Sequence, residues 1–220
     1  MKIAYIVFSA TPYKMGRFIR TVLHNEYNHV SLAFEEDLSV MYSFARFHEN
    51  APLYGGFVTE SPCRHVRAEE SSRIKVCRIE MEEENYLRLR EFVSRMEQSD
   101  RHYIYNMYSA ILSPLHIRFL IRDSYTCAEF VGDALSIAGA KLPRGAFHSL
   151  SRIQRLLEPC VIYEGPCEDY ICSRHWGSDR FPERMSRFRA AMATAHSLWR
   201  LTCRAAVSLG TMVFFWELPM

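Results

Sequence analysis

The chain lacks most of the short motifs that indicate a bound nucleotide or nucleic acid. It has no Walker phosphate loop and no glycine-rich dinucleotide fingerprint, and it contains neither internal repeats nor low-complexity tracts. Basic residues interleaved with aromatic ones, which would favour nucleic-acid binding, are not found, and the net charge is only +2. We therefore expect no cofactor and no nucleic-acid partner.

Disulfide bonds and a zinc site are not indicated either. The seven cysteines form an odd set without a tight repeat, in a chain longer than a small disulfide-stapled scaffold. Cys160, Cys167, Cys172 and His175 are the conceivable zinc ligands, but they lack the C-x-x-C spacing of a zinc knuckle. We expect free thiols in a reducing compartment, hence a cytoplasmic location and no metal.

Two segments have an apolar character that needs interpretation. Residues 3–8 could belong to a signal peptide, but they also form an ordinary buried strand, which is the favoured interpretation. Residues 181–220 join an arginine-rich stretch to an apolar run shorter than the roughly 20 residues of a spanning helix. We expect this tail to pack back onto the domain. The alternative is an interfacial helix peripheral to a membrane, with arginines at the headgroups and aromatics inward.

The overall composition is that of a globular protein, with 49% hydrophobic and 24% charged residues. Its length favours one domain with an appendage, which we assign to residues 1–180 and 181–220. Apolar spacing predicts helices at 14–24, 80–98, 123–139 and 149–157. It predicts strands at 3–8, 29–34, 40–45, 54–60, 73–79 and 160–163. The second and third strands are expected to form a hairpin.

The rest of the chain is expected to be organised around the helix at residues 123–139. Its apolar residues follow the i, i+3, i+4, i+7 spacing of one buried stripe: Cys127, Phe130, Val131, Ala134, Leu135 and Ala138. Two polar residues of the same helix are expected to face solvent: Asp133 and Ser136. Thr126 or Ser124 can cap the start, and Glu129 lies where the helix dipole favours an acid. Cys127 then occupies the first turn, where a helix N-terminus stabilises a thiolate.

A nucleophilic cysteine needs an imidazole to activate it and a polar group to orient that imidazole. His29 is the candidate base. Alternation places it on a strand face whose other side chains, Ser31 and Ala33, are small enough for another element to approach closely. The helix of Cys127 is one candidate for that element. Without such a partner, a cysteine of this kind is more often a small core residue.

Two residues compete to orient His29. Ser43 returns opposite His29 if the hairpin turns near residues 36–37. Glu60 would hold an imidazolium more strongly, because a carboxylate carries charge and a hydroxyl does not. Alternatively, Glu60 is an exposed acid at the end of a strand.

Three segments resemble a known family. They are Asn-His-Val-Ser-Leu-Ala-Phe at 28–34, Met-Tyr-Ser-Phe at 41–44, and Tyr-Thr-Cys-Ala-Glu-Phe-Val-Gly-Asp-Ala-Leu at 125–135. They are similar to circularly permuted NlpC-type, papain-like cysteine hydrolases of the YiiX-like group, which are related to the lecithin–retinol acyltransferase-like group. In these proteins the histidine precedes the cysteine, the reverse of papain. The resemblance covers roughly residues 1–165 and leaves the tail outside.

The resemblance implies an α+β, permuted papain-like fold in which an antiparallel sheet packs against the Cys-bearing helix. Cys127 would be the nucleophile and His29 the base of a peptidase-like or amidase-like hydrolase. The backbone N–H of Cys127, at the start of the helix, would stabilise the oxyanion that forms on the substrate carbonyl. Tyr105 stands where such enzymes often keep a helper tyrosine, although it could also be an aromatic core residue. Ser43 departs from the Glu or His that the family usually has at that position.

The expected reaction is cleavage of an amide or ester bond through a thioacyl-enzyme intermediate. Two alternatives remain. An acyltransferase would use the same dyad with an amine or a lipid hydroxyl in place of water, and a degenerate binding module would keep the fold without catalysis. The substrate would be a small molecule, a peptide or a lipid, and the membrane contact of the tail would be peripheral.

Overall fold

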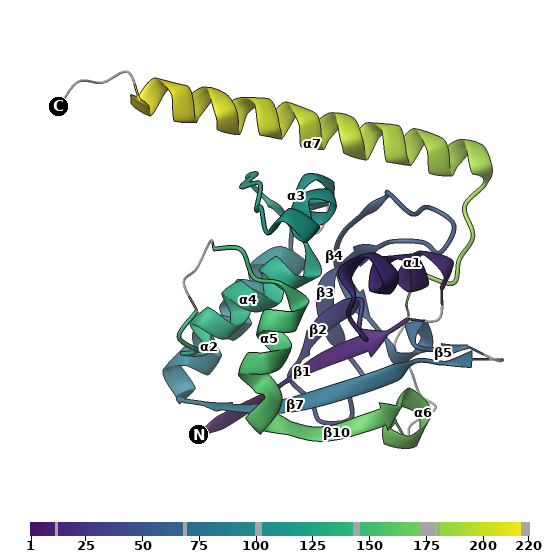
Figure 1. The fold of residues 1–220 in the computed structure, drawn as a ribbon, viewed down its shortest axis with the longest axis vertical. Coiled ribbons are helices and arrows are strands. Elements are labelled where there is room, and N and C mark those ends of the chain that lie inside the picture. Colours follow the sequence, from purple (N-terminus) through teal and green to yellow (C-terminus); the bar gives the residue numbers. More distant parts are fainter. Residues whose placement is uncertain are drawn as a thin grey trace.

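A six-stranded antiparallel sheet lies at the centre of the molecule, with helices around it (Figure 1). The computed structural model describes residues 1–11, 13–67, 70–99, 103–142, 146–171, 179 and 181–216. The strands follow the order β10 (Val161–Pro166), β7 (Arg73–Met81), β1 (Lys2–Ala10), β2 (His29–Ala33), β3 (Met41–Arg46) and β4 (Gly55–Glu60). Together with its helices, this sheet confirms the α+β class.

The described helices are α1 (Lys14–Leu23), α2 (Glu83–Glu97), α3 (Met107–Leu112), α4 (Cys127–Ile137), α5 (Leu150–Leu157), α6 (Cys167–Tyr170) and α7 (Arg187–Trp216). Three 3₁₀ turns accompany them: η1 (Pro62–Arg64), η2 (Ser113–Leu115) and η3 (Glu158–Cys160). Two small sheets are formed by β5 (Val66–Arg67) with β6 (Glu70–Ser71), and by β8 (Ile104–Tyr105) with β9 (Ser124–Tyr125). The expected strand at 160–163 is thus found one residue later, because Cys160 belongs to η3.

The apolar N-terminal segment is a core strand, as the favoured interpretation predicts. β1 lies between β7 and β2 and pairs with both in antiparallel register, with Phe8 opposite Val30 and Lys75. Both faces of β1 are covered, so successive side chains are buried and the strand is a continuous apolar run. Its pairing with β2 fixes the position of His29 at one end of the sheet, opposite Ser9.

Each face of the sheet has its own apolar cluster. On one face, α2, α4 and α5 contribute to a cluster with Val30, Leu32 and Phe44. On the other face, Ala33 and Met41 pack with residues that include Cys167 of α6. The expectation that α4 lies on the face of the small residues is therefore wrong. The bulky face offers more apolar area to the helix than Ser31 and Ala33 would, and burial of that area favours this packing.

The start of α4 is fixed by a capping box. The Thr126 hydroxyl accepts a hydrogen bond from the Glu129 N–H at 3.2 Å, and the Glu129 carboxylate accepts one from the Thr126 N–H at 2.7 Å. This satisfies two backbone donors that a helix N-terminus leaves without intrahelical partners. Cys127 is consequently held as the first helical residue.

The apolar stripe of α4 is confirmed, since Phe130, Val131, Ala134 and Leu135 are all buried. The prediction for Asp133 is wrong: it is only 6% exposed. Arg118, from the segment after η2, covers this side of the helix and approaches Asp133 at 3.8 Å. Ser136 is half-buried. Helical periodicity could not reveal this, because the covering side chain comes from a loop.

The tail forms the 30-residue helix α7, which crosses one end of the molecule (Figure 1). Leu201 and Ala205 pack against Ile104 and Ile121 in a small cluster of their own. Polar contacts join the same surfaces, with Tyr108 and Thr202 hydroxyls 2.9 Å apart. Within the described residues, no helix is long and apolar enough to span a membrane.

Candidate active site

The segment before Cys127 is tied to a second short strand. β8 and β9 pair in parallel, so that Tyr105 lies beside Tyr125, and the Asn106 N–H donates to the Tyr125 carbonyl at 2.9 Å. The Asn106 side chain then caps α3 by accepting from the Ser109 N–H. Cys127 is therefore positioned by backbone pairing on one side and by the capping box on the other. It is 6% exposed.

His29 and Glu60 form a buried ion pair. The imidazole Nε2 lies 2.8 Å and 3.1 Å from the two carboxylate oxygens of Glu60. The Ser31 hydroxyl donates to the same carboxylate at 2.7 Å. Glu60 is 1% exposed, so the interpretation as a solvent-facing acid at a strand end is wrong. A carboxylate so enclosed fixes the orientation of the imidazole ring.

The other partner of His29 is the Cys127 thiol. Burial by itself would lower the pKa of His29, but the charge of Glu60 and hydrogen bonds with Cys127 and Glu60 outweigh it and raise this pKa to about 10. Because Nε2 faces the carboxylate, Nδ1 is the ring nitrogen left for the thiol. At neutral pH the imidazole is therefore an imidazolium, which stabilises a thiolate beside it.

A second layer of charge holds Glu60. Burial would raise the pKa of Glu60, yet the charge and hydrogen bond of His29, together with the charge of Arg64, keep it below its usual range. Arg64 is itself bound to Asp179, its Nη2 donating at 2.8 Å. Asp179 also accepts a hydrogen bond from the Ser61 N–H at 3.1 Å. Charged groups thus continue from His29 through Glu60 and Arg64 to Asp179.

Arg64, His65 and Asp179 were not among the residues expected at the site. The sequence carries one signal for Arg64, which follows Glu60 by four residues. Asp179 lies far along the chain near the tail, and no local pattern relates it to Glu60. His65 is 2% exposed, and neither ring nitrogen has a hydrogen-bond partner within the described residues. Burial, with the positive charges of His29 and Arg64, lowers the pKa of His65 to about 4, so it is neutral at pH 7.

The structure places Ser43 away from the imidazole. Its hydroxyl donates to the Val30 carbonyl at 2.7 Å, and the side chain is fully buried. The hairpin register pairs Leu32 with Tyr42 and Ala33 with Met41, so Ser43 lies farther from His29 along the strand than expected. The role of orienting His29 therefore belongs to Glu60, from the strand beyond β3.

Tyr105 lies beside the cysteine. Burial, followed by the charges of Cys127 and Glu129, raises the pKa of Tyr105 well above its ordinary value. The hydroxyl is thus protonated at neutral pH and able to donate a hydrogen bond. Tyr105 lines the same cavity as Cys127 and His29.

Backbone donors are also available at the start of α4. The first intrahelical bond runs from the Phe130 N–H to the Thr126 carbonyl at 3.1 Å, and the Glu129 N–H is taken by the Thr126 hydroxyl. The N–H groups of Cys127 and Ala128 precede both and have no intrahelical acceptor. A carbonyl oxygen bound beside the thiol could receive hydrogen bonds from them.

A cavity of about 560 Å³ brings these groups together. Cys127, His29, Glu60 and Tyr105 all line it. Most of its other walls are apolar: Tyr13, Ile19, Phe44, Leu53, Met107, Ala110, Ile111, Pro114, Phe147, Leu150 and Phe181. Its volume suits a small-molecule ligand. The lining extends into η2 and into α3, whose Tyr108 is hydrogen-bonded to Thr202 of α7.

Among the described residues, no group of His, Cys, Asp and Glu could hold a metal ion. Cys160 is at the end of η3 and Cys167 is the first residue of α6. Cys172 and His175, the other two conceivable zinc ligands, lie outside the described residues. The cysteines at positions 77, 127, 160, 167 and 203 are free thiols.

Comparisons of the chain with family models, with curated proteins and with solved structures found no match.

Proposed function

We propose that the protein is a cysteine hydrolase on a permuted papain-like fold, with Cys127 as nucleophile, His29 as base and Glu60 as the residue that orients His29. The observation that carries this proposal is the buried His29–Glu60 pair beside a cysteine at a helix N-terminus. Structural ion pairs also occur in proteins. Here, however, the three groups line a cavity that a substrate could enter.

The reaction would begin from a thiolate and an imidazolium. The Cys127 sulfur adds to the carbonyl carbon of an amide or ester, and the carbonyl electrons move to oxygen, which accepts hydrogen bonds from the start of α4 and from Tyr105. The C–N or C–O bond then breaks, and His29 gives its proton to the leaving amine or alkoxide. The product on the protein is a thioester.

Water completes the cycle. It adds to the thioester carbonyl while His29 takes one of its protons, and the C–S bond then breaks. The acid leaves, and the thiolate and imidazolium are restored. Glu60 keeps its charge throughout, because its role is to hold the imidazolium.

Acyl transfer is a second candidate, in which an amine or alcohol replaces water. The mainly apolar lining of the cavity favours it, since such a lining suits an apolar acyl chain or acceptor better than free water. The same lining favours substrates with an apolar acyl part. The presence of Glu60 weakens the case for a degenerate binding module, which depended on Ser43 as the orienting group.

The test is to incubate the full chain with a mixture of acyl amides and acyl esters, quench it in acid, and weigh the protein by mass spectrometry. A mass increase equal to one acyl group on the peptide of Cys127 is expected, and Cys127→Ala should abolish it. Cys127→Ser should nearly do so, because a hydroxyl is far harder to ionise. Release of free acid or of an acylated acceptor then separates hydrolysis from transfer. If Cys127→Ala turns over substrate as the wild type does, the proposal is wrong.

A further inference from the structure

Large apolar side chains are exposed in an uneven way. Twelve are exposed within the described residues, and eight of these belong to two neighbouring segments at one end of the molecule. Four lie on or after α3: Ile111, Leu115, Ile117 and Leu120. Four lie on α7: Phe188, Met192, Trp199 and Val207. The two segments adjoin, because Met107, Tyr108 and Phe119 pack against the cluster that contains Leu201 and Ala205 of α7, and Tyr108 is hydrogen-bonded to Thr202.

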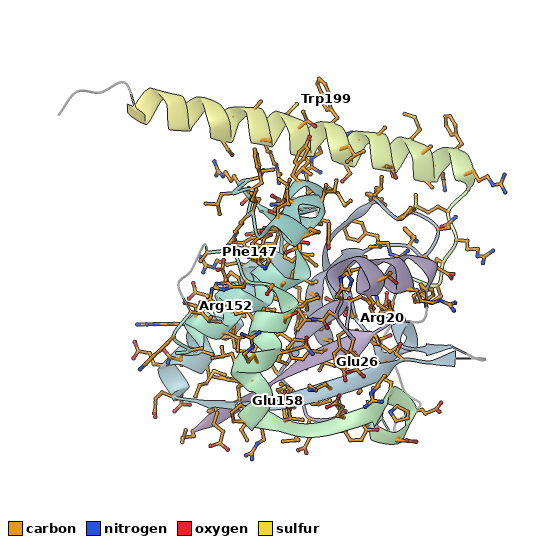
Figure 2. The ribbon with its side chains drawn as sticks, in the orientation of Figure 1. Arg20, Glu26, Phe147, Arg152, Glu158 and Trp199 are labelled. Atoms are coloured by element: carbon orange, nitrogen blue, oxygen red, sulfur yellow. The ribbon has the colours of Figure 1, made fainter. Side chains whose placement is uncertain are left out.

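α7 has two faces with different roles. Its buried residues, Ala190, Ser197, Leu201 and Ala205, follow one another at intervals of seven and four. Four exposed residues follow intervals of four and seven: Phe188, Met192, Trp199 and Cys203. This series starts two residues before the buried one, and that offset places it on the opposite side of the helix. Figure 2 shows Trp199, 68% exposed, pointing away from the body. These four residues are the outer stripe of α7.

The charges around the outer stripe have one sign. Residues 187–216 contain four arginines and no aspartate or glutamate. Helical spacing puts Arg189 and Arg200 along one border of the outer stripe, eleven residues apart. Apolar and aromatic side chains bordered by cations are typical of helices that lie in the interface of a membrane. A polybasic border adds attraction to anionic headgroups.

We infer that the outer stripe of α7 docks on an anionic lipid surface, with Phe188, Met192 and Trp199 entering the interface and Arg189 and Arg200 at the headgroups. This inference does not depend on the catalytic proposal. A second copy of the chain is a poorer occupant, because two such helices would bring arginines of like charge together. The active-site cavity is lined in part by Ile111 and Pro114 of the adjoining segment, so docking would hold the cavity next to the lipid.

The test is flotation of the full chain with phosphatidylcholine vesicles, with and without phosphatidylglycerol. We expect binding to the anionic vesicles that is at least about tenfold tighter than to the neutral ones and that weakens with added salt. The double variant Phe188→Glu/Trp199→Glu should lose at least about tenfold in affinity, as should Arg189→Glu/Arg200→Glu. Leu87→Glu is the matched control, because Leu87 is an exposed apolar residue of α2 and should leave binding unchanged.

Cys203 supplies a second measurement, since it belongs to the outer stripe. Its alkylation should slow when anionic vesicles are added, and neutral vesicles should leave it unchanged. Far-UV circular dichroism checks that the variants keep their helices. Equal binding to both kinds of vesicle, or no binding by the wild type, would overturn the inference. So would a dimer in sedimentation velocity that the double variant Phe188→Glu/Trp199→Glu abolishes, since the stripe would then serve a second copy.

Discussion

Replacing Glu60 with glutamine removes the charge that holds His29 and changes little else. Glutamine keeps the size of the side chain and one carbonyl acceptor for the Ser31 hydroxyl. Arg64 stays paired, because its Nε and Nη2 atoms both contact Asp179. His29 is then left in a buried position without its counter-charge. Its pKa, about 10 in the wild type, is expected to fall below the ordinary value of 6.5.

The magnitude follows from that interval. A rise of the His29 pKa from 6.5 to about 10 corresponds to roughly 5 kcal/mol of free energy that favours the imidazolium over the neutral ring. Cys127 supplies part of it, so the loss in the variant is smaller than the whole. We expect the thiolate–imidazolium form to be depopulated by about a hundredfold or more at neutral pH. Because buried His29 loses its charged partner, the variant should also lose about 3 kcal/mol of unfolding free energy.

The assay is alkylation by iodoacetamide at pH 6, followed peptide by peptide with mass spectrometry. Cys203 is a free, exposed cysteine of α7 and gives an internal reference. Glu60→Gln should slow Cys127 about a hundredfold relative to Cys203. Ser43→Ala is the control, because its hydroxyl bonds to the Val30 carbonyl and should leave the Cys127 rate unchanged. If Glu60→Gln alkylates at the wild-type rate, Glu60 does not hold the imidazolium.

Three further outcomes are expected. Leu135→Ala should cost about 2–5 kcal/mol in urea unfolding, because Leu135 is 1% exposed in the core; a loss within error would refute its burial. Gly132→Ala should cost about 1–3 kcal/mol, since a Cβ there would lie 2.5 Å from the His148 ring; a wild-type midpoint would refute that contact. Stability from His29, whose pKa is raised, should be lost as pH rises from 6.5 towards about 10. Stability from Glu60, whose pKa is lowered, should be lost as pH falls below about 4.5. Urea unfolding across pH should therefore show a maximum between these limits that Glu60→Gln removes.

Periodicity predicts the main elements, because each turns a regular series of apolar residues toward a buried cluster. The helix of Cys127 and its cap were predictable, since spacing and a Thr–Glu pair three residues apart are local signals. The face of the sheet that α4 covers was not predictable in the same way. Alternation separates two faces, and both are buried here, so it could not tell which one receives the helix.

The same difference between local patterns and long-range contacts applies to the candidate site. Cys127 and His29 were predictable as a pair, because each stands in a segment with a recognisable pattern. Whether Ser43 or Glu60 orients His29 depends on the hairpin register and on a contact across a strand, which no local pattern contains. The burial of Asp133 depends on Arg118, and the place of Asp179 near the site depends on Arg64. In each pair the two residues come from different parts of the chain. Such charge pairs form only when the fold is complete.

The rate of Cys127 alkylation against pH, in the wild type and in His29→Ala, tests the central claim most directly. A thiolate–imidazolium pair predicts that wild-type Cys127 is alkylated much faster than Cys203 at pH 6, where His29 is charged. In His29→Ala the profile should move to that of Cys203, because the thiol has lost the cation that stabilises its charged form. A Cys127 that reacts like Cys203 in the wild type, and that His29→Ala leaves unchanged, would contradict the catalytic dyad.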